Sequence, residues 1–294
     1  MSKYSREYGM RLAAGKTWHI KAADCLSPWL DKLASITGLD TSGPNPHSQL
    51  LFIPNSPGKE IPGEASRSKL PQNGWSVHDF RALRIWFHPH MADVICEIGP
   101  EKVPELDIAR MWLSLYPIYH RAQGSGGLPF HAALIERDGV GVLLAGQGNA
   151  GKSTCCRRIP PPWQAWCDDE VLVVRDDGKG YQAHPFPTWS DYIFRQCDRT
   201  WNVEWHVPLS AIFFLERAEA DEVASLGRGQ AAVRIVQSTM QVWDKWFLLD
   251  AKEKGASRST CFENACELAK AVPAFLLRVS LKGQFWKEME KVLP

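Results

Sequence analysis

The sequence predicts an α/β fold in two parts, and three observations support this prediction. From Gly126 onward, apolar runs typical of strands alternate with helical patterns, an order that favours a sheet with helices on its faces. The first 120 residues begin instead with a hairpin pattern followed by a helix, which indicates an α+β subdomain. A glycine-rich segment directly follows an apolar run within residues 140–154. We therefore predict an N-terminal subdomain at 1–120 and a second domain at 121–294.

The N-terminal part starts with "MRLAAGKTWHIKA" at residues 10–22, which predicts two strands about an Ala-Gly turn. "SPWLDKLASITG" then predicts a helix with Ser27 as N-cap, Pro28 at its first position and Gly38 as its stop. Residues 41–76 are rich in Pro, Gly, Ser and Asn around one apolar island. This composition predicts a long loop with at most one edge strand.

Further strands and helices are predicted by the apolar patterns that follow. "LRIWFH" and "DVICEI" indicate strands, and residues 104–116 have helical spacing, with Pro104 at the start and Pro117 ending or kinking the helix. The second part is predicted to contain a hairpin in "FHAALIERDGVGVLLAG", a short helix, strands in "AWCDDEVLVV" and "LSAIFFLE", helices near 229–245 and 262–271, a strand in "AFLLRVSL" and a final helix.

Composition excludes several classes of partner. The 34 basic and 33 acidic residues nearly cancel, so no basic field indicates nucleic acid or an anionic membrane as a partner. The N-terminus lacks the apolar region of a signal peptide, and no run reaches the length of a membrane span. The eight cysteines lack C-x-x-C spacing. We expect a cytoplasmic protein with mostly reduced thiols.

The segment "GQGNAGKS" at residues 146–153 has the G-x-x-x-x-G-K-S pattern of a Walker A phosphate-binding loop, or P-loop. Backbone N–H groups at a helix N-terminus can converge on a polyphosphate, and glycines permit the backbone path that this requires. The lysine adds charge for the β and γ phosphates, and the serine hydroxyl can ligate the accompanying Mg²⁺. The alternative is a tight strand-to-helix connection without a ligand. The candidate nucleotide-binding residues are Gly146, Gly148, Asn149, Ala150, Gly151, Lys152, Ser153 and Thr154.

Three acids precede an apolar strand in "WCDDEVLVV". Acids at such a position are costly to bury without a cation or hydrogen-bond donors. We predict that Asp168 and Asp169, as adjacent strand residues with opposite side-chain directions, divide two tasks, holding Mg²⁺ and accepting the proton of an acceptor hydroxyl. The alternative is a charged turn that opens a strand.

His131 lies in the predicted strand that pairs, through the Arg137-Asp138-Gly139 turn, with the strand before the loop. This hairpin would bring the imidazole near the loop, where it is a candidate catalytic group. The alternative is a packed, hydrogen-bonded histidine without a catalytic role.

These pieces occur in the same order in the HPr kinase/phosphorylase family. The string "HAALIERDGVGVLLAGQGNAGKST", followed by "WCDDEVLVV", resembles that family over residues 126–175. More closely, the chain resembles the kinase-like component C of the SynChlorMet cassette, the ScmC group. This closer resemblance covers nearly all of the chain, through "GGLPFHAAL", "HPFPTWSD", "VPLSAIFFLE" and "FENACELAKAVPAFLLRVS".

The resemblance implies a core similar to the nucleotide core of PEP carboxykinase, a mixed sheet with flanking helices. It implies phosphoryl transfer from ATP or pyrophosphate to a protein serine, and relatives in peptide-maturation (RiPP) clusters phosphorylate peptide hydroxyls. Carried over to this chain, it implies Mg²⁺ at Ser153 and Asp168, Asp169 as the base, and His131 and Lys152 near the transferring phosphate. Which aspartate has which task stays open.

The chain also departs from the HPr kinase pattern. Thr154 stands where those enzymes usually have a glutamate, and their arginine-containing segment that assists phosphorolysis is not evident, so we do not expect phosphorylase activity. The N-terminal 120 residues do not resemble the N-terminal domain of the long HPr kinases. A candidate cation for the transferring phosphoryl group is Arg195 or Arg199; the alternative for either is a solvated helix face.

The first functional hypothesis is therefore an ATP-dependent kinase that phosphorylates a Ser or Thr hydroxyl of a peptide or small protein, with cassette proteins as further partners and a homo-oligomer as one assembly state. The second is a nucleotide-binding module that recruits a peptide and does little chemistry. The third is a kinase of a free small metabolite, because the transfer machinery would look the same. Acceptor contacts follow no pattern that the sequence reveals.

Overall fold

The structure is a computed structural model that describes residues 6–41, 48–55, 74–80, 83–88, 90–99, 103–195, 197–243 and 251–293. The chain forms two compact units. The first contains the residues up to Ile118 and the segment Trp189–Glu204, and the second contains Tyr119–Thr188 and the residues from Trp205 onward. Residues 189–204 thus group with the first unit, although the sequence analysis places them in the domain 121–294.

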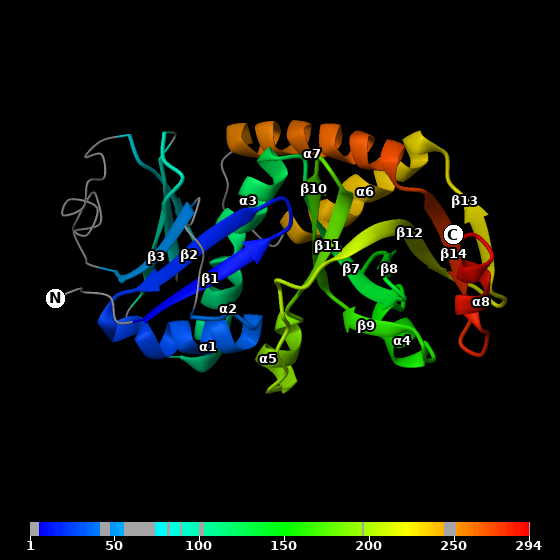
Figure 1. The fold of residues 1–294 in the computed structure, drawn as a ribbon, viewed down its shortest axis with the longest axis horizontal. Coiled ribbons are helices and arrows are strands. Elements are labelled where there is room, and N and C mark those ends of the chain that lie inside the picture. The colour runs from blue at the N-terminus through cyan, green and yellow to red at the C-terminus, as the bar shows by residue number, and fades with distance from the viewer. Residues whose placement is uncertain are drawn as a thin grey trace. The chain divides into compact units, whose positions relative to one another are not determined.

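The first unit is built on a mixed sheet whose strands, among the described residues, follow the order β1-β2-β3-β6-β5-β4 (Figure 1). The pairs β2–β3 and β3–β6 are parallel and the other neighbours are antiparallel. The strands are β1 (Arg6–Leu12), β2 (Lys16–Ala22), β3 (Ser48–Pro54), β4 (Ser76–Asp79), β5 (Leu83–Phe87) and β6 (Val94–Ile98). The predicted N-terminal hairpin and the strands in "LRIWFH" and "DVICEI" are confirmed. Most of the predicted loop at 41–76 lies outside the described residues. Its apolar island forms β3, which pairs with β2 on one side and β6 on the other, so the prediction of an edge strand is wrong.

The helices of this unit differ from the prediction at their ends. Helix α1 (Ser27–Thr37) ends at Gly38 in the left-handed conformation, as predicted, but Ser27 is its first helical residue and Leu26 is the N-cap, without a side-chain cap bond. Helix α2 (Pro104–Leu113) ends before Pro117, which is the second residue of α3 (Tyr116–Gly124), a helix whose residues from Tyr119 onward belong to the second unit. Proline is tolerated there because the first turn of a helix has no use for its N–H. The short helix α5 is Trp189–Arg195.

The second unit has a sheet in the order β11-β10-β7-β8-β12-β14-β13, with β9 paired to β7. Its strands are β7 (Leu128–Arg137), β8 (Val140–Ala145), β9 (Gln164–Cys167), β10 (Glu170–Asp176), β11 (Gly180–Phe186), β12 (Val207–Arg217), β13 (Glu222–Ser225) and β14 (Ala274–Val279). β12 is parallel to β8 and β14, and the other pairs are antiparallel. A short β11–β12 pairing closes β11, β10, β7, β8 and β12 into a ring.

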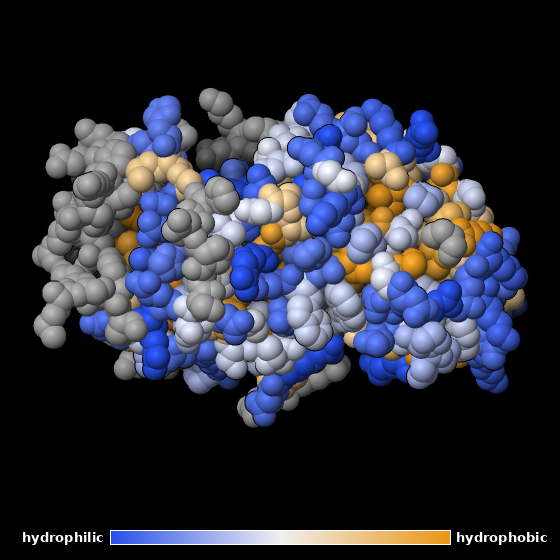
Figure 2. All heavy atoms as spheres, viewed as in Figure 1, coloured by the Kyte–Doolittle hydropathy of each residue, from blue (hydrophilic) through white to orange (hydrophobic). Residues whose placement is uncertain are grey.

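Helices cover both faces of this sheet. The helices are α4 (Lys152–Arg158), α6 (Arg228–Trp243), α7 (Ala251–Ala271) and α8 (Phe285–Glu290). Cys155 of α4 and Phe285 of α8 belong to the same buried cluster as Ile135, Leu144 and Phe213 of the central strands, whereas α6 and α7 pack together and against β7. In the view of Figure 2, hydrophilic residues lie over the C-terminal part of α7, and hydrophobic residues gather over β12 and β14. The prediction of a fold that mixes α and β elements is confirmed, because each unit contains a mixed sheet with helices.

No helix among the described residues is long and apolar enough to cross a bilayer.

Gly141 allows β8 and β12 to approach each other closely. A Cβ atom on this residue would lie 2.4 Å from Cγ1 of Val207 and 2.8 Å from the carbonyl oxygen of Pro208. Because one of these contacts is backbone, Gly141→Ala must move the strands, and we expect it to lower the free energy of unfolding by about 1–3 kcal/mol. Urea denaturation of the purified variant measures this change.

The matched control is Gly229→Ala in α6. There the added Cβ would meet nothing within 4 Å, and alanine favours the helix by up to about 1 kcal/mol over glycine. We expect this variant to be as stable as the wild type or more stable. Equal stability of the two variants would show that Gly141 is not needed for the strand contact.

Candidate active site

The glycine-rich loop connects the end of β8 to the start of α4, the strand-to-helix context that the sequence predicts. Gly146 lies so close to Ala150 that a Cβ on it would be 2.8 Å from the Ala150 methyl group. Asn149 and Gly151 have φ angles of 64° and 109°, in the left-handed region. The loop is thus curved tightly enough that its backbone N–H groups can face a common point.

Lys152 is buried at the start of α4, with 6% of its surface exposed. Its Nζ donates hydrogen bonds to the carbonyl oxygens of Gly146 at 3.0 Å and Gln147 at 3.1 Å. The ammonium group therefore lies against the loop that a polyphosphate would occupy. Ser153 and Thr154 follow in the first turn and are half-buried.

Cys155 adds no negative charge to this turn. Burial raises the pKa of its thiol to about 11, although the nearby Arg158 lowers it. The thiol is therefore neutral near pH 7.

Asp168 and Asp169 form a bend between β9 and β10 rather than adjacent positions of one strand. The prediction that strand alternation separates their side chains is therefore wrong, because the strand breaks at these two residues. Their carboxylates nevertheless have different partners. Oδ1 of Asp168 accepts a hydrogen bond from the Thr188 hydroxyl at 2.7 Å, whereas Oδ1 of Asp169 lies 3.0 Å from Nδ1 of His131.

His131 and Asp169 are brought together by the pairing of β7 with β10, in which His131 is opposite Glu170. His131 Nδ1 also lies 3.1 Å from the backbone oxygen of Asp169, which accepts a hydrogen bond from the N–H of Ala132. With its Nδ1 held by Asp169, the imidazole has a defined orientation. The backbone oxygen of His131 accepts a hydrogen bond from the Ser238 hydroxyl of α6 at 3.2 Å.

Glu170 and Tyr119 form a buried polar pair beside these residues that the sequence analysis did not identify. Glu170 is 1% exposed, and its Oε2 accepts a hydrogen bond from the Tyr119 hydroxyl at 3.0 Å. Burial, and then the charge of Glu170, hold the pKa of Tyr119 well above its usual range. The phenol therefore remains a hydrogen-bond donor, and it supports the strand that begins immediately after Asp169.

We expect Tyr119→Phe to lower the free energy of unfolding by about 1.5–3 kcal/mol, because it removes a donor to a buried carboxylate. The comparison is Tyr8→Phe in the first unit, where the phenol donates to the half-exposed Asp31 at 2.7 Å. Tyr8→Phe should lower the free energy of unfolding by less than Tyr119→Phe does, because water can replace the phenol as a donor to Asp31. Denaturant unfolding of both proteins tests this, and an equal loss would argue against a special role for the buried pair.

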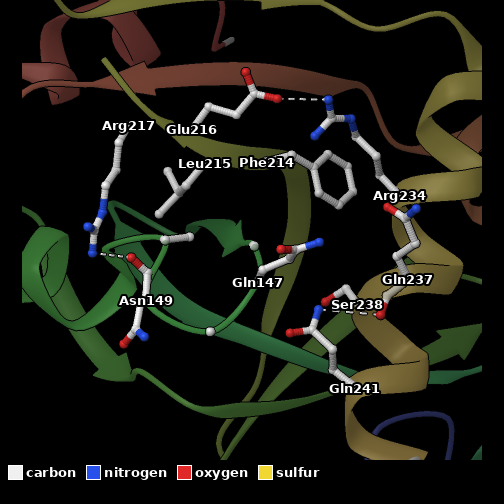
Figure 3. Close-up of a pocket in the computed structure, with 13 residues that line it drawn as sticks. Gln147, Asn149, Phe214, Leu215, Glu216, Arg217, Arg234, Gln237, Ser238 and Gln241 are labelled. Atoms are coloured by element: carbon white, nitrogen blue, oxygen red, sulfur yellow. Dashed lines mark hydrogen bonds and ion pairs between the residues drawn. The ribbon is translucent and has the colours of Figure 1, made fainter. Parts of the chain in front are cut away.

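A cavity of about 430 Å³ lies between the loop, the C-terminal end of β12 and α6. In Figure 3, Arg217 donates a hydrogen bond to the backbone oxygen of Asn149, and Arg234 forms an ion pair with Glu216 at 3.0 Å. The residues that line the cavity are Gly146, Gln147, Gly148, Asn149, Ala150, Phe214, Leu215, Glu216, Arg217, Arg234, Gln237, Ser238 and Gln241.

The α6 residues of this cavity were missed by sequence reasoning. Arg234, Gln237, Ser238 and Gln241 follow the i, i+3, i+4, i+7 spacing of one helix face. This spacing is visible in the sequence, but a polar helix face is usually exposed to solvent. Only the fold shows that it faces the loop.

Arg195 and Arg199, either of which is a candidate cation for the transferring phosphoryl group, belong to the first unit. The guanidinium of Arg199 lies 4.8 Å from the centroid of the Trp201 ring, and the side chain of Arg195 is outside the described residues. Their catalytic role stays a prediction. Arg217 and Arg234 are arginines that the second unit itself places beside the loop.

Among the described residues, no group of three or more His, Cys, Asp and Glu side chains is arranged to hold a metal ion. Mg²⁺ needs fewer protein ligands than such a group provides, because it takes one or two carboxylates and completes its coordination shell with phosphate oxygens and water. The Ser153 hydroxyl and the Asp168 carboxylate offer the oxygen donors that this ion prefers. These two residues thus fit the predicted ion by their chemistry.

Comparison with known proteins places this site within a family. No match was found among curated proteins. A family model described as "SynChlorMet cassette protein ScmC" matches residues 94–294. The match covers more than half of the chain and includes the loop, His131, both aspartates and the lining of the cavity. The chain therefore belongs to the SynChlorMet cassette protein ScmC family.

Proposed function

We propose that the protein is an ATP-dependent kinase of the HPr kinase type, with a PEP carboxykinase-like P-loop core, that phosphorylates a Ser or Thr hydroxyl of a peptide or small protein. The observation that carries this proposal is the loop at 146–153, which joins β8 to α4 and holds the buried Lys152 ammonium. The His131–Asp169 pair in the same unit supports it. Membership in a cassette family suggests that the acceptor is a peptide of the same gene set.

The loop and Lys152 would bind the donor. Its backbone N–H groups and the N-terminus of α4 suit a triphosphate, and Lys152 adds a positive charge for the β and γ phosphates. Ser153 and Asp168 would hold Mg²⁺, which would supply positive charge to neutralise the phosphates. The Thr188 hydroxyl orients the Asp168 carboxylate by the hydrogen bond at 2.7 Å.

Asp169 would accept the proton of the acceptor hydroxyl. As that proton moves to the carboxylate, the hydroxyl oxygen bonds to the γ phosphorus, and the bond from the γ phosphorus to its β-bridging oxygen breaks, which releases ADP. His131 orients Asp169 through the contact at 3.0 Å.

The test is to incubate the protein with MgATP and the peptides and small proteins encoded beside it, and to follow each by mass spectrometry. The expected result is the gain of one phosphoryl group on a Ser or Thr residue, with equal release of ADP. A screen of small hydroxyl compounds runs in parallel, because phosphorylation only in that screen would identify a metabolite kinase. ATP binding without transfer to any acceptor would contradict catalysis.

One observation favours a second candidate, a peptide-recruitment module with little catalysis. The rings of Trp166 and Trp205 lie 6.1 Å apart, and Trp205 is 60% exposed. Exposed aromatic pairs are common in peptide-binding surfaces, and Trp166 is close in sequence to Asp168. A stable peptide complex in the presence of ATP, without any mass gain on the peptide, would support this role.

A further inference from the structure

The cavity adjoins the loop along β12 and α6, and one of its lining residues, Ser238, donates a hydrogen bond to the backbone oxygen of His131. In the sheet order β10-β7-β8-β12, β8 lies between β7, which carries His131, and β12, whose C-terminal end lines the cavity. A donor bound in the loop would therefore lie beside this cavity, whose lining includes neither His131 nor Asp169. The cavity is placed for the part of the donor that does not react.

The lining of the cavity is suited to a neutral heterocycle rather than to a second anion. Phe214 and Leu215 supply apolar surface, and in Figure 3 the amides of Gln147 and Gln241 point into the space between the loop and α6. The charge of Arg234 is balanced by Glu216 at 3.0 Å, and Arg217 donates its hydrogen bond to the backbone oxygen of Asn149. An anionic ligand would meet that carboxylate, whereas a nucleobase needs an apolar wall and amide partners.

Gln237 and Gln241 can supply these partners from α6. A carboxamide carries both a donor and an acceptor, the combination that the edges of nucleobases present. Both residues line the cavity. The Nε2 of Gln241 lies 3.4 Å from the backbone oxygen of Gln237, which holds the amide beside the helix. The volume of about 430 Å³ is within the range of about 300–1,000 Å³ typical of small-molecule sites.

We propose that this cavity binds the nucleoside of the phosphoryl donor, with Gln237 and Gln241 hydrogen-bonded to the base, so that the donor is a nucleoside triphosphate and not pyrophosphate. The inference rests on the proposed function, because it takes the loop as the phosphate site. It adds the binding site of the nucleoside and two specificity-determining residues on α6.

The experiment is calorimetric titration of the whole protein with ATP and with inorganic tripolyphosphate, each with Mg²⁺. Tripolyphosphate has the phosphates of ATP without the nucleoside, so the difference between the two affinities measures what the cavity contributes. The variant is Gln237→Ala/Gln241→Ala. The control is Val233→Ala, a truncation at an exposed position of α6 outside the cavity.

The wild type is expected to bind ATP at least about tenfold more tightly than tripolyphosphate. The double variant should lose about five- to a hundredfold in ATP affinity, as expected for two hydrogen bonds, with tripolyphosphate affinity unchanged. Equal affinity of the wild type for both ligands, or an equal loss of both in the variant, would overturn the nucleoside site while leaving the phosphate loop intact. If neither ligand binds the wild type, the proposed function fails and this inference fails with it.

Discussion

Asp169→Asn is expected to lower the rate of phosphoryl transfer by about 10²–10⁴-fold, the usual contribution of a general base, while MgATP affinity stays within about twofold of the wild type. The substitution should remove the basicity of the side chain at position 169 and leave the bend between β9 and β10 unchanged. The bend is held through the backbone oxygen of Asp169, which lies 3.1 Å from both the Ala132 nitrogen and His131 Nδ1. An asparagine oxygen can still accept from His131 but cannot take the hydroxyl proton.

Single-turnover transfer to the identified acceptor measures this effect, beside calorimetry of MgATP. Asp177→Asn is the matched control, because its carboxylate is 92% exposed and belongs to the same unit. Asp168→Asn separates the two aspartates: it should raise the Mg²⁺ concentration needed for transfer. If Asp169→Asn transfers phosphate at the full rate, Asp169 is not the base. If Asp169→Asn instead needs more Mg²⁺ for transfer, Asp169 holds the ion and Asp168 is the base.

Lys152→Met is expected to weaken MgATP binding by about ten- to a hundredfold. Hydrogen bonds to a charged group contribute about 1.5–3 kcal/mol each, which corresponds to this change in affinity. Methionine keeps the unbranched apolar stem of the buried lysine and removes the ammonium that lies against Gly146 and Gln147. Calorimetric titration with MgATP, MgADP and pyrophosphate measures the loss of affinity for each of these ligands.

The exposed Lys282→Met serves as the control for removing one positive charge. Because two loop carbonyls lose a donor in Lys152→Met, denaturant unfolding of this variant must show that it is folded before its affinity is interpreted. Ser153→Ala provides a second variant with a smaller change, and it should weaken the Mg²⁺-dependent part of binding. Undiminished MgATP affinity in folded Lys152→Met would mean that the loop is a structural connection.

Local patterns in the sequence were sufficient to predict the elements that surround the site. The hairpin of β7 and β8, the loop and the two-turn α4 follow from apolar runs, glycines and the prolines after Arg158, all of which act on neighbouring residues. The break between β9 and β10 was missed because apolar residues flank the three acids on both sides, so that "AWCDDEVLVV" was interpreted as one strand. An acid pair can open a strand or form a bend, and strand pairing decides between the two.

The sequence by itself determined the position of the loop, the identities of Lys152, Ser153, Asp168, Asp169 and His131, and the α/β class, because each depends on contiguous residues. Only the tertiary structure decided which side chains meet: His131 with Asp169, Thr188 with Asp168, and Tyr119 with Glu170. It also placed the polar face of α6 across a cavity from the loop. These contacts join residues far apart in the chain, and they depend on strand pairing and helix packing that no local pattern encodes.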